Sequence, residues 1–174
     1  MTINYSDEYN TEFDFDYNKI AELVVSETLK QEHFPYDVEI GISFVDEDSI
    51  RELNEQFRGI DKSTDVLSFP MIDFSDMDIG DDNICEMYGF IEDDESYFNP
   101  DNNEVLLGDI VLCIPKVISQ AKEYNHSVLR EYAFLIAHSM LHLIGYDHID
   151  EGERVVMESK QDSILESLNL SRDC

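Results

Sequence analysis

Residues 127–148, SVLREYAFLIAHSMLHLIGYDH, form the stretch of sequence that decides the fold. Only Arg130 and Glu131 carry a charge before Gly145, and the rest of the segment is apolar on nearly every side. A helix that is apolar all round is normally buried. The sequence therefore predicts a buried helix over residues 127–144, which ends where the glycine supplies a helix stop.

This helix also carries a cluster of histidines. His138 and His142 are four residues apart, so they lie one turn apart on the same face. Gly145 lets the chain leave the helix through a positive φ, which can bring His148 back toward the same point. A lone histidine on an apolar helix is usually an ordinary core residue, but three that converge favour a metal site. With one coordination position open, the set is typical of a catalytic zinc site, and we expect one Zn²⁺ per chain.

The spacing matches the three ligand positions and the glycine of the metzincin motif H-E-x-x-H-x-x-G-x-x-H. It departs where the protease has its general-base glutamate, because Ser139 occupies that position. Serine does not take a proton from water at neutral pH, so the usual proton shuttle of peptide cleavage is missing. A zinc peptidase-like hydrolase stays open as an alternative, with Asp147 as the nearest carboxylate.

The flanking sequence predicts a small α+β protein. Strand patterns cover three segments: 38–44, 65–71 and 105–114. Helical spacing covers four more: 17–33, 46–59, 115–124 and 150–168. In the last of these, we expect the apolar residues to face inward, namely Val155, Val156, Ile164, Leu165 and Leu168. We therefore expect residues 1–174 to form a single compact domain, in which a small mixed β-sheet packs with helices and the zinc-binding helix is buried against the sheet.

The charge of the chain excludes several classes of function. The 174 residues hold 11 Lys and Arg against 40 Asp and Glu, which gives a formal net charge of −29. A generic cationic nucleic-acid binder and an adhesive for anionic membranes both need the opposite balance. Much of the excess lies in an acidic N-terminal segment, 1–17, and an acidic insertion, 72–104. The insertion shows no clear period, so we expect a solvated loop or, alternatively, a partner-docking arm.

The sequence also predicts where the protein works. The first 18 residues hold no Lys or Arg, unlike a secretory signal, and no apolar run reaches the roughly 18 residues of a membrane span. Three widely spaced cysteines, Cys85, Cys113 and Cys174, do not form a disulfide framework. We expect a cytoplasmic protein with no membrane partner.

Taken together, these motifs resemble the YbeY family of endoribonucleases. Three blocks carry the resemblance: His138–His148, similar to the signature H-G-x-L-H-L-x-G-x-D-H; Leu53-Asn54 through Arg58 with Thr64–Pro70; and Leu107–Ile110. They occur in matching order within residues 20–170. Ser139 departs from the family, which has glycine there. The acidic insertion 72–104 is a second departure, because it is longer than the usual connection.

The resemblance implies an α+β fold with one zinc ion held by His138, His142 and His148, and a functional arginine at Arg58. It implies a metal-dependent endoribonuclease specific for single-stranded RNA, which acts near the 3′ end of small-subunit ribosomal RNA and in ribosome quality control. Arg58 and His142 are then the candidate catalytic residues, since a guanidinium can grip a phosphate bidentately. We expect RNA as substrate, a ribosome or ribosomal protein as partner, and no DNA.

Two questions stay open on sequence grounds. The attacking group is either metal-activated water or the 2′-hydroxyl of the RNA. The protein can also be a zinc-stabilised, ribosome-associated binding protein without nuclease activity, whose acidic face docks a basic ribosomal protein. A fourth metal ligand, such as Cys113 or His126, would favour that alternative. Because bases are few, we expect weak binding of free RNA.

Overall fold

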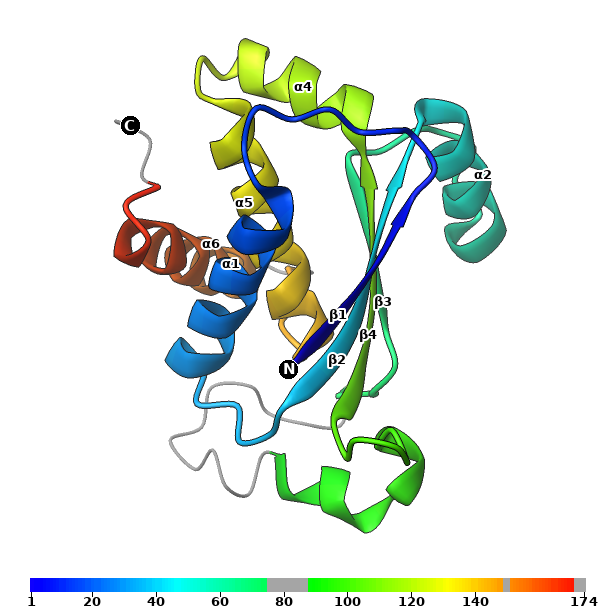
Figure 1. The fold of residues 1–174 in the computed structure, drawn as a ribbon, viewed down its shortest axis with the longest axis vertical. Coiled ribbons are helices and arrows are strands. Elements are labelled where there is room, and N and C mark those ends of the chain that lie inside the picture. Colours follow the sequence, from blue (N-terminus) through cyan, green and yellow to red (C-terminus); the bar gives the residue numbers. More distant parts are fainter. Residues whose placement is uncertain (75–87, 149–150, 171–174) are drawn as a thin grey trace.

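The structure is a computed structural model that describes residues 1–74, 88–148 and 151–170. Its centre is a four-stranded sheet with the strand order β1-β2-β4-β3 (Figure 1). The strands are β1 (Thr2–Asp7), β2 (Val38–Val45), β3 (Val66–Pro70) and β4 (Val105–Cys113). β1, β2 and β4 run parallel, and β3 pairs antiparallel with β4. The sheet is therefore mixed, as expected, and β3 is one of its edges.

Five α-helices within the described ranges pack around this sheet. They are α1 (Tyr17–Gln31), α2 (Glu47–Arg58), α4 (Ile114–Glu123), α5 (Val128–Leu143) and α6 (Glu151–Ser167). Figure 1 shows α1, α5 and α6 on one side of the sheet and α2 on the other. None of the helices in the described ranges combines the length and the hydropathy that a bilayer crossing requires. The prediction of a single α+β domain with a mixed sheet is confirmed.

Helix α5 is the centre of the main core. Eleven of its sixteen residues are buried, and it contacts α1, α4, α6, β3 and β4. The Ser127 hydroxyl accepts a hydrogen bond from the Arg130 amide (3.1 Å) and so caps the first turn. At the other end, Gly145 has φ 105° and the Tyr146 amide bonds back to the Leu141 carbonyl (2.9 Å). The predicted buried helix and its glycine stop are both present.

The opposite face of the sheet holds a smaller core. Ile50 of α2 packs there with Val45, Leu67, Val111 and Cys113. Cys113 is fully buried in this cluster, and burial raises the pKa of its thiol to about 11. This cysteine is therefore a packing residue of the sheet, on the face covered by α2.

The acidic segment 1–17 contains a strand that the sequence did not indicate. β1 pairs in parallel with β2, so that Ile3 lies opposite Ile40 and Tyr5 opposite Ile42. Only these two side chains of β1 are apolar and inward, and both are only partly buried. Two alternating residues within an acidic segment are too weak a period to predict an edge strand.

The described part of the acidic insertion, 72–74 and 88–104, is more ordered than a solvated loop. It contains two 3₁₀ helices, η1 (Phe90–Asp93) and η2 (Glu95–Tyr97). Ile72, Phe74, Tyr88 and Ile91 are buried in the main core. Residues 75–87 of the insertion, with Cys85, and the C-terminal Cys174 lie outside the described residues.

Candidate metal centre and active site

A cleft with a volume of about 1080 Å³ lies between the edge strand β3 and the C-terminal end of α5. Its walls include all three predicted metal ligands, His138, His142 and His148, and also Arg58. The histidines come from α5 and the turn after it, whereas Arg58 is the last residue of α2 on the far side of β3. The fold therefore brings together the residues that the sequence singled out but could not place relative to one another.

The three histidines converge tightly. One nitrogen from each ring lies within 4.8 Å of the corresponding nitrogen of the other two. The Nε2 atoms of His138 and His142 are 3.1 Å apart. Zinc–nitrogen bonds of about 2.0–2.1 Å in a tetrahedral set require nitrogen separations of about 3.3 Å. The spacing of this pair is thus close to what one zinc ion needs.

The outer nitrogens of two rings fix which atoms face the centre. His142 Nδ1 donates to the main-chain oxygen of Tyr146 (2.9 Å), because a carbonyl only accepts. His138 Nδ1 likewise donates to an oxygen, the Oε1 atom of Gln161 (3.4 Å). Both Nε2 atoms are then bare acceptors that point at each other. Two lone pairs at this distance are unfavourable unless a cation lies between them, so the residues fit a divalent metal ion.

The titration of these rings agrees with a ligand role. Burial lowers the pKa of His138, and burial together with the neighbouring histidines lowers the pKa of His142 to about 4. Both imidazoles are therefore neutral at pH 7. The neutral ring is the form that binds a metal ion.

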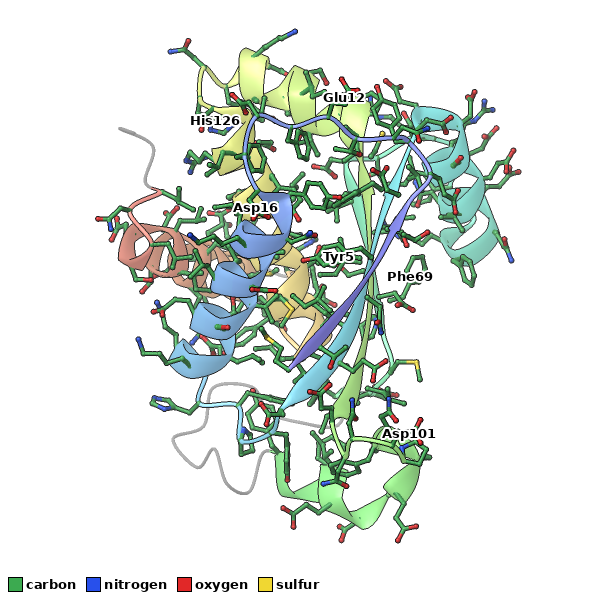
Figure 2. The ribbon with its side chains drawn as sticks, in the orientation of Figure 1. Tyr5, Glu12, Asp16, Phe69, Asp101 and His126 are labelled. Atoms are coloured by element: carbon green, nitrogen blue, oxygen red, sulfur yellow. The ribbon has the colours of Figure 1, made fainter. Side chains whose placement is uncertain are left out.

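The structure shows three possible ligands in this cluster, and no fourth from the residues it describes. His126 lies elsewhere, beside the junction of α4 and α5 (Figure 2). Its Nε2 atom is 2.6 Å from Glu131 Oε2, and its Nδ1 atom accepts from Arg130 (2.6 Å). Cys113 lies in the core on the α2 face of the sheet. Three ligands with an open position are typical of catalytic rather than structural zinc sites.

Arg58 is exposed at the rim of the cleft, where α2 ends. Gly59 terminates that helix in the left-handed region (φ 69°), and its amide bonds to the Glu55 carbonyl (2.9 Å). The helix end therefore directs a cationic side chain to the cleft that holds the histidines. A guanidinium in this position can bind two oxygens of a phosphate whose other oxygens face the three histidines.

Sequence reasoning singled out Asp147 but missed other carboxylates of the cleft, among them Asp65 and Glu153. Asp65 and Glu153 line it together with the exposed Asp147. Asp65 is held at the start of β3, where its Oδ1 atom accepts from the Thr64 hydroxyl (3.1 Å) and the Val66 amide (2.8 Å). The motif Thr64–Pro70 contains Asp65, but only the strand pairing turns this residue toward the cleft.

Ser139, which departs from the glycine of the resembled signature, lies outside the cleft. Ser139 is fully buried, its hydroxyl has no hydrogen-bond partner in the described part of the chain, and it does not line the cleft. The side chain that stands in the place of a protease glutamate is thus turned into the core.

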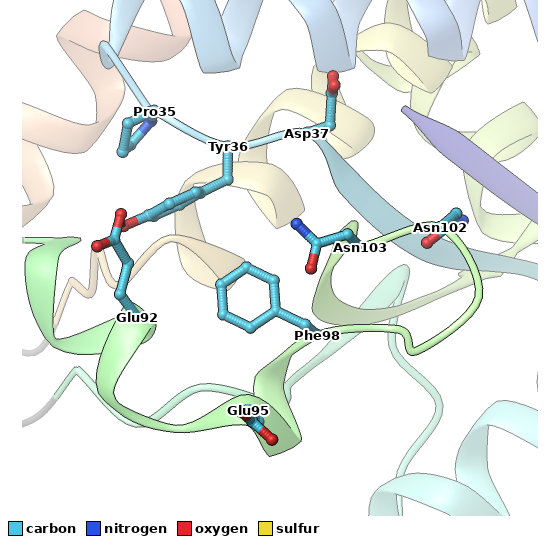
Figure 3. Close-up of a pocket in the computed structure, with 8 residues that line it drawn as sticks. All are labelled: Pro35, Tyr36, Asp37, Glu92, Glu95, Phe98, Asn102 and Asn103. Atoms are coloured by element: carbon cyan, nitrogen blue, oxygen red, sulfur yellow. Dashed lines mark hydrogen bonds between the residues drawn. The ribbon is translucent and has the colours of Figure 1, made fainter.

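A second hollow, with a volume of about 540 Å³, lies near the 3₁₀ helices (Figure 3). Its walls combine aromatic rings, carboxylates and amides, and the Tyr36 hydroxyl donates to Glu92 there (3.1 Å). None of the predicted site residues lines it. Of the two hollows, only the histidine cleft contains the site residues that the sequence predicts.

An α+β fold in which three histidines converge in a cleft with an arginine at its rim is typical of one class, the small proteins with a catalytic-type metal centre. A family model described as "Endoribonuclease YbeY" matches residues 2–169 of the sequence. The chain belongs to the YbeY family.

Relatives and a solved structure agree with this assignment. A protein named "Endoribonuclease YbeY" from Lachnospira eligens is 49% identical over 99% of this chain and 100% of its own length. Proteins of the same name from Agathobacter rectalis and Clostridium tetani are 46% and 45% identical, over 99% and 90% of this chain and 100% and 90% of their own. The solution structure of TM1509 from Thermotoga maritima has a TM-score of 0.53 at 24% identity, and the match covers 97% of this chain and 92% of that one. That likeness supports the fold.

Proposed function

We propose that this protein is a zinc-dependent endoribonuclease that cleaves single-stranded RNA during the maturation of ribosomal RNA. We further propose that it acts near the 3′ end of the small-subunit RNA and in ribosome quality control, in the cytoplasm and with a ribosomal partner. The observation that carries the proposal is the cleft in which His138, His142 and His148 meet Arg58. Curated relatives that carry the name endoribonuclease along their full length support the reaction class.

In this proposal, His138, His142 and His148 hold the metal ion. A bound divalent ion supplies Lewis acidity toward water and phosphate oxygens. The Tyr146 carbonyl and the Gln161 side chain hold two of the imidazoles in the tautomer that presents Nε2. Arg58 binds the scissile phosphate and offsets the negative charge that builds up on it in the transition state.

The carboxylates of Asp65 and Glu153 are the candidate proton acceptors, because they line the same cleft. Attack by the RNA 2′-hydroxyl forms an O2′–P bond and breaks the P–O5′ bond. The 2′-hydroxyl proton passes to a base, and the departing O5′ takes up a proton from the protonated base or from water. The products then carry a 2′,3′-cyclic phosphate and a 5′-hydroxyl. Attack by water gives no cyclic phosphate, so the product ends identify the attacking group.

Cleavage of a labelled single-stranded RNA by the zinc-loaded protein tests the proposal, with Arg58→Ala beside Arg51→Ala. Both substitutions remove one positive charge from exposed positions of α2, but Arg51 pairs with Asp61 and does not line the cleft. We expect the parent and Arg51→Ala to cleave alike. Arg58→Ala should lose on the order of 100-fold in kcat, because one transition-state contact is gone.

Equal cleavage by all three proteins would remove Arg58 from the active site and point to a contaminating nuclease. Chelation should abolish cleavage by the parent, and re-addition of Zn²⁺ should restore it. Chelator-sensitive hydrolysis of casein without RNA cleavage would favour the peptidase alternative. A protein that binds zinc but cleaves neither substrate, even beside ribosomes, would favour the binding protein.

A further inference from the structure

We propose that Glu32 and Lys160 are positioning residues for the metal centre, and that they act on His142 through Tyr146. This inference rests on the metal site of the proposed function and adds to it a set of residues that touch neither substrate nor metal. It is carried by a chain of close polar contacts that runs from the end of α1 and the middle of α6 to one of the histidines.

Tyr146 links the metal site to the rest of the molecule. It lies in the turn between His142 and His148, and its main-chain oxygen accepts the Nδ1–H of His142 (2.9 Å). Its phenol group points the other way and donates to Glu32 Oε2 (2.5 Å). One residue thus sets the ring orientation of His142 with its backbone and is itself held by its side chain.

The partner of that phenol is a buried carboxylate that is paired with a half-buried lysine. The Glu32 side chain is only 5% exposed, and Lys160 Nζ lies 2.9 Å from each of its carboxylate oxygens. The same ammonium group lies 5.1 Å from the centroid of the Tyr146 ring. A buried carboxylate is stable only when paired and hydrogen-bonded, and here the lysine and the phenol meet that need together. Removing the lysine or the phenol takes away one of the two contacts that stabilise the Glu32 carboxylate and hold Tyr146 in place.

The turn that carries Tyr146 is held in part by the hydrogen bond from its phenol to Glu32. Gly145 adopts a positive φ, and the next two residues, Asp147 and His148, are exposed. Two backbone hydrogen bonds, from the Gly145 amide to His142 and from the Tyr146 amide to Leu141, hold the turn to α5. The phenol contact to Glu32 adds a fixed point outside α5. It therefore controls the direction of the carbonyl that faces His142.

Helix α6 also contacts a second proposed ligand, and this contact is direct. Gln161, the neighbour of Lys160, is buried and presents Oε1 to His138 Nδ1 (3.4 Å). Adjacent residues of one helix thus reach His138 directly and His142 through Tyr146. A displacement of α6 would change the orientation of both rings at once.

The test measures the affinity of the full-length protein for Zn²⁺ by chelator competition, and the visible spectrum of its Co²⁺ form. Tyr146→Phe and Lys160→Met should each weaken Zn²⁺ binding on the order of tenfold and shift the Co²⁺ absorption bands, as loss of outer contacts to metal ligands does. Lys160→Arg keeps the charge beside Glu32 and should restore most of the affinity.

Tyr132→Phe is the matched control. Tyr132 is a buried tyrosine of α5 whose hydroxyl donates to the Tyr17 carbonyl (3.2 Å), away from the histidines. Its variant loses the same kind of hydrogen bond but should keep the parent affinity and spectrum. If Tyr146→Phe and Lys160→Met fold and bind Zn²⁺ like the parent, the positioning role is wrong. If the parent itself binds neither ion, the proposed metal dependence fails instead.

Discussion

His142 makes the metal-free protein sensitive to acid. Its pKa is lowered, first by burial and then by the neighbouring histidines, from 6.5 to about 4. Between pH 4 and pH 6.5, the His142 ring is protonated in the unfolded chain but not in the folded protein. The contribution of this ring to stability is therefore complete above pH 6.5 and is lost as the pH falls toward 4, by up to about 3 kcal/mol.

Urea denaturation of the metal-free protein at pH 7.5 and pH 5 measures this effect. We expect the free energy of unfolding of the parent to fall more over this interval than that of His142→Gln, which has no titrating ring at the position. A variant whose pH dependence matches that of the parent would show that His142 does not carry the effect.

At the scale of single residues, the sequence predicted the parts of the site that are local. The histidine spacing and Gly145 lie within eleven residues, so one helix and the turn after it bring the rings together. The contacts of Tyr146 and Gln161 could not be predicted, because they depend on how α1 and α6 pack on α5. The position of Arg58 at the cleft was equally out of reach, since it depends on where α2 ends relative to β3.

At the scale of elements, Gly108 controls the approach of β4 to its neighbours. It lies where the register between β2 and β4 shifts, with φ 138°. A Cβ atom there would overlap the main-chain oxygen of Phe69 on β3 and lie 3.0 Å from the Leu143 side chain of α5. We expect Gly108→Ala to lower the free energy of unfolding by about 2 kcal/mol or more.

Gly89→Ala is the matched control for that substitution. Gly89 has an ordinary φ of −59°, and a Cβ atom there meets none of the described residues within 4 Å. The Gly89→Ala variant, whose added Cβ is clear of the described residues, should unfold within about 0.5 kcal/mol of the parent. Thermal or urea unfolding of both variants compares them, and equal stabilities would contradict the steric argument.

The elements themselves were predictable where their period was strong. The pattern over 38–44 predicted β2, and the apolar segment after Ser127 predicted α5. Helical spacing alone suggested that Val155 and Val156 face inward, but they are 56% and 47% exposed. The inward face of α6 instead includes Met157 and Gln161. The polar Gln161 is buried against His138, a contact that a hydrophobic pattern does not reveal.

At the scale of the whole molecule, the net charge of −29 governs the encounter with RNA. Affinity for nucleic acid normally comes from Lys and Arg that neutralise phosphates, and the chain has 11 in all. We expect a bare single-stranded RNA of 20 nucleotides to bind with a Kd of about 10⁻⁵ M or weaker at physiological salt. Fluorescence anisotropy over a salt series measures it, and the slope of log K against log salt should stay below about 2 in magnitude.

A tight complex with bare RNA that does not respond to salt would contradict this expectation. It would require a binding surface that does not depend on phosphate charge. A gain in affinity on addition of ribosomal subunits would agree with a partner that supplies the missing attraction.

The compactness of the histidine cluster along the chain affects how the protein acquires its metal. Because the three rings lie within eleven residues, an unfolded chain also offers them to an ion at high local concentration. Binding to the unfolded state subtracts from the stabilisation that a ligand gives to the folded state. Zinc should therefore raise the melting temperature by less than its affinity implies. A nascent chain can also take up the ion once residue 148 has emerged, before α6 arrives to orient the rings.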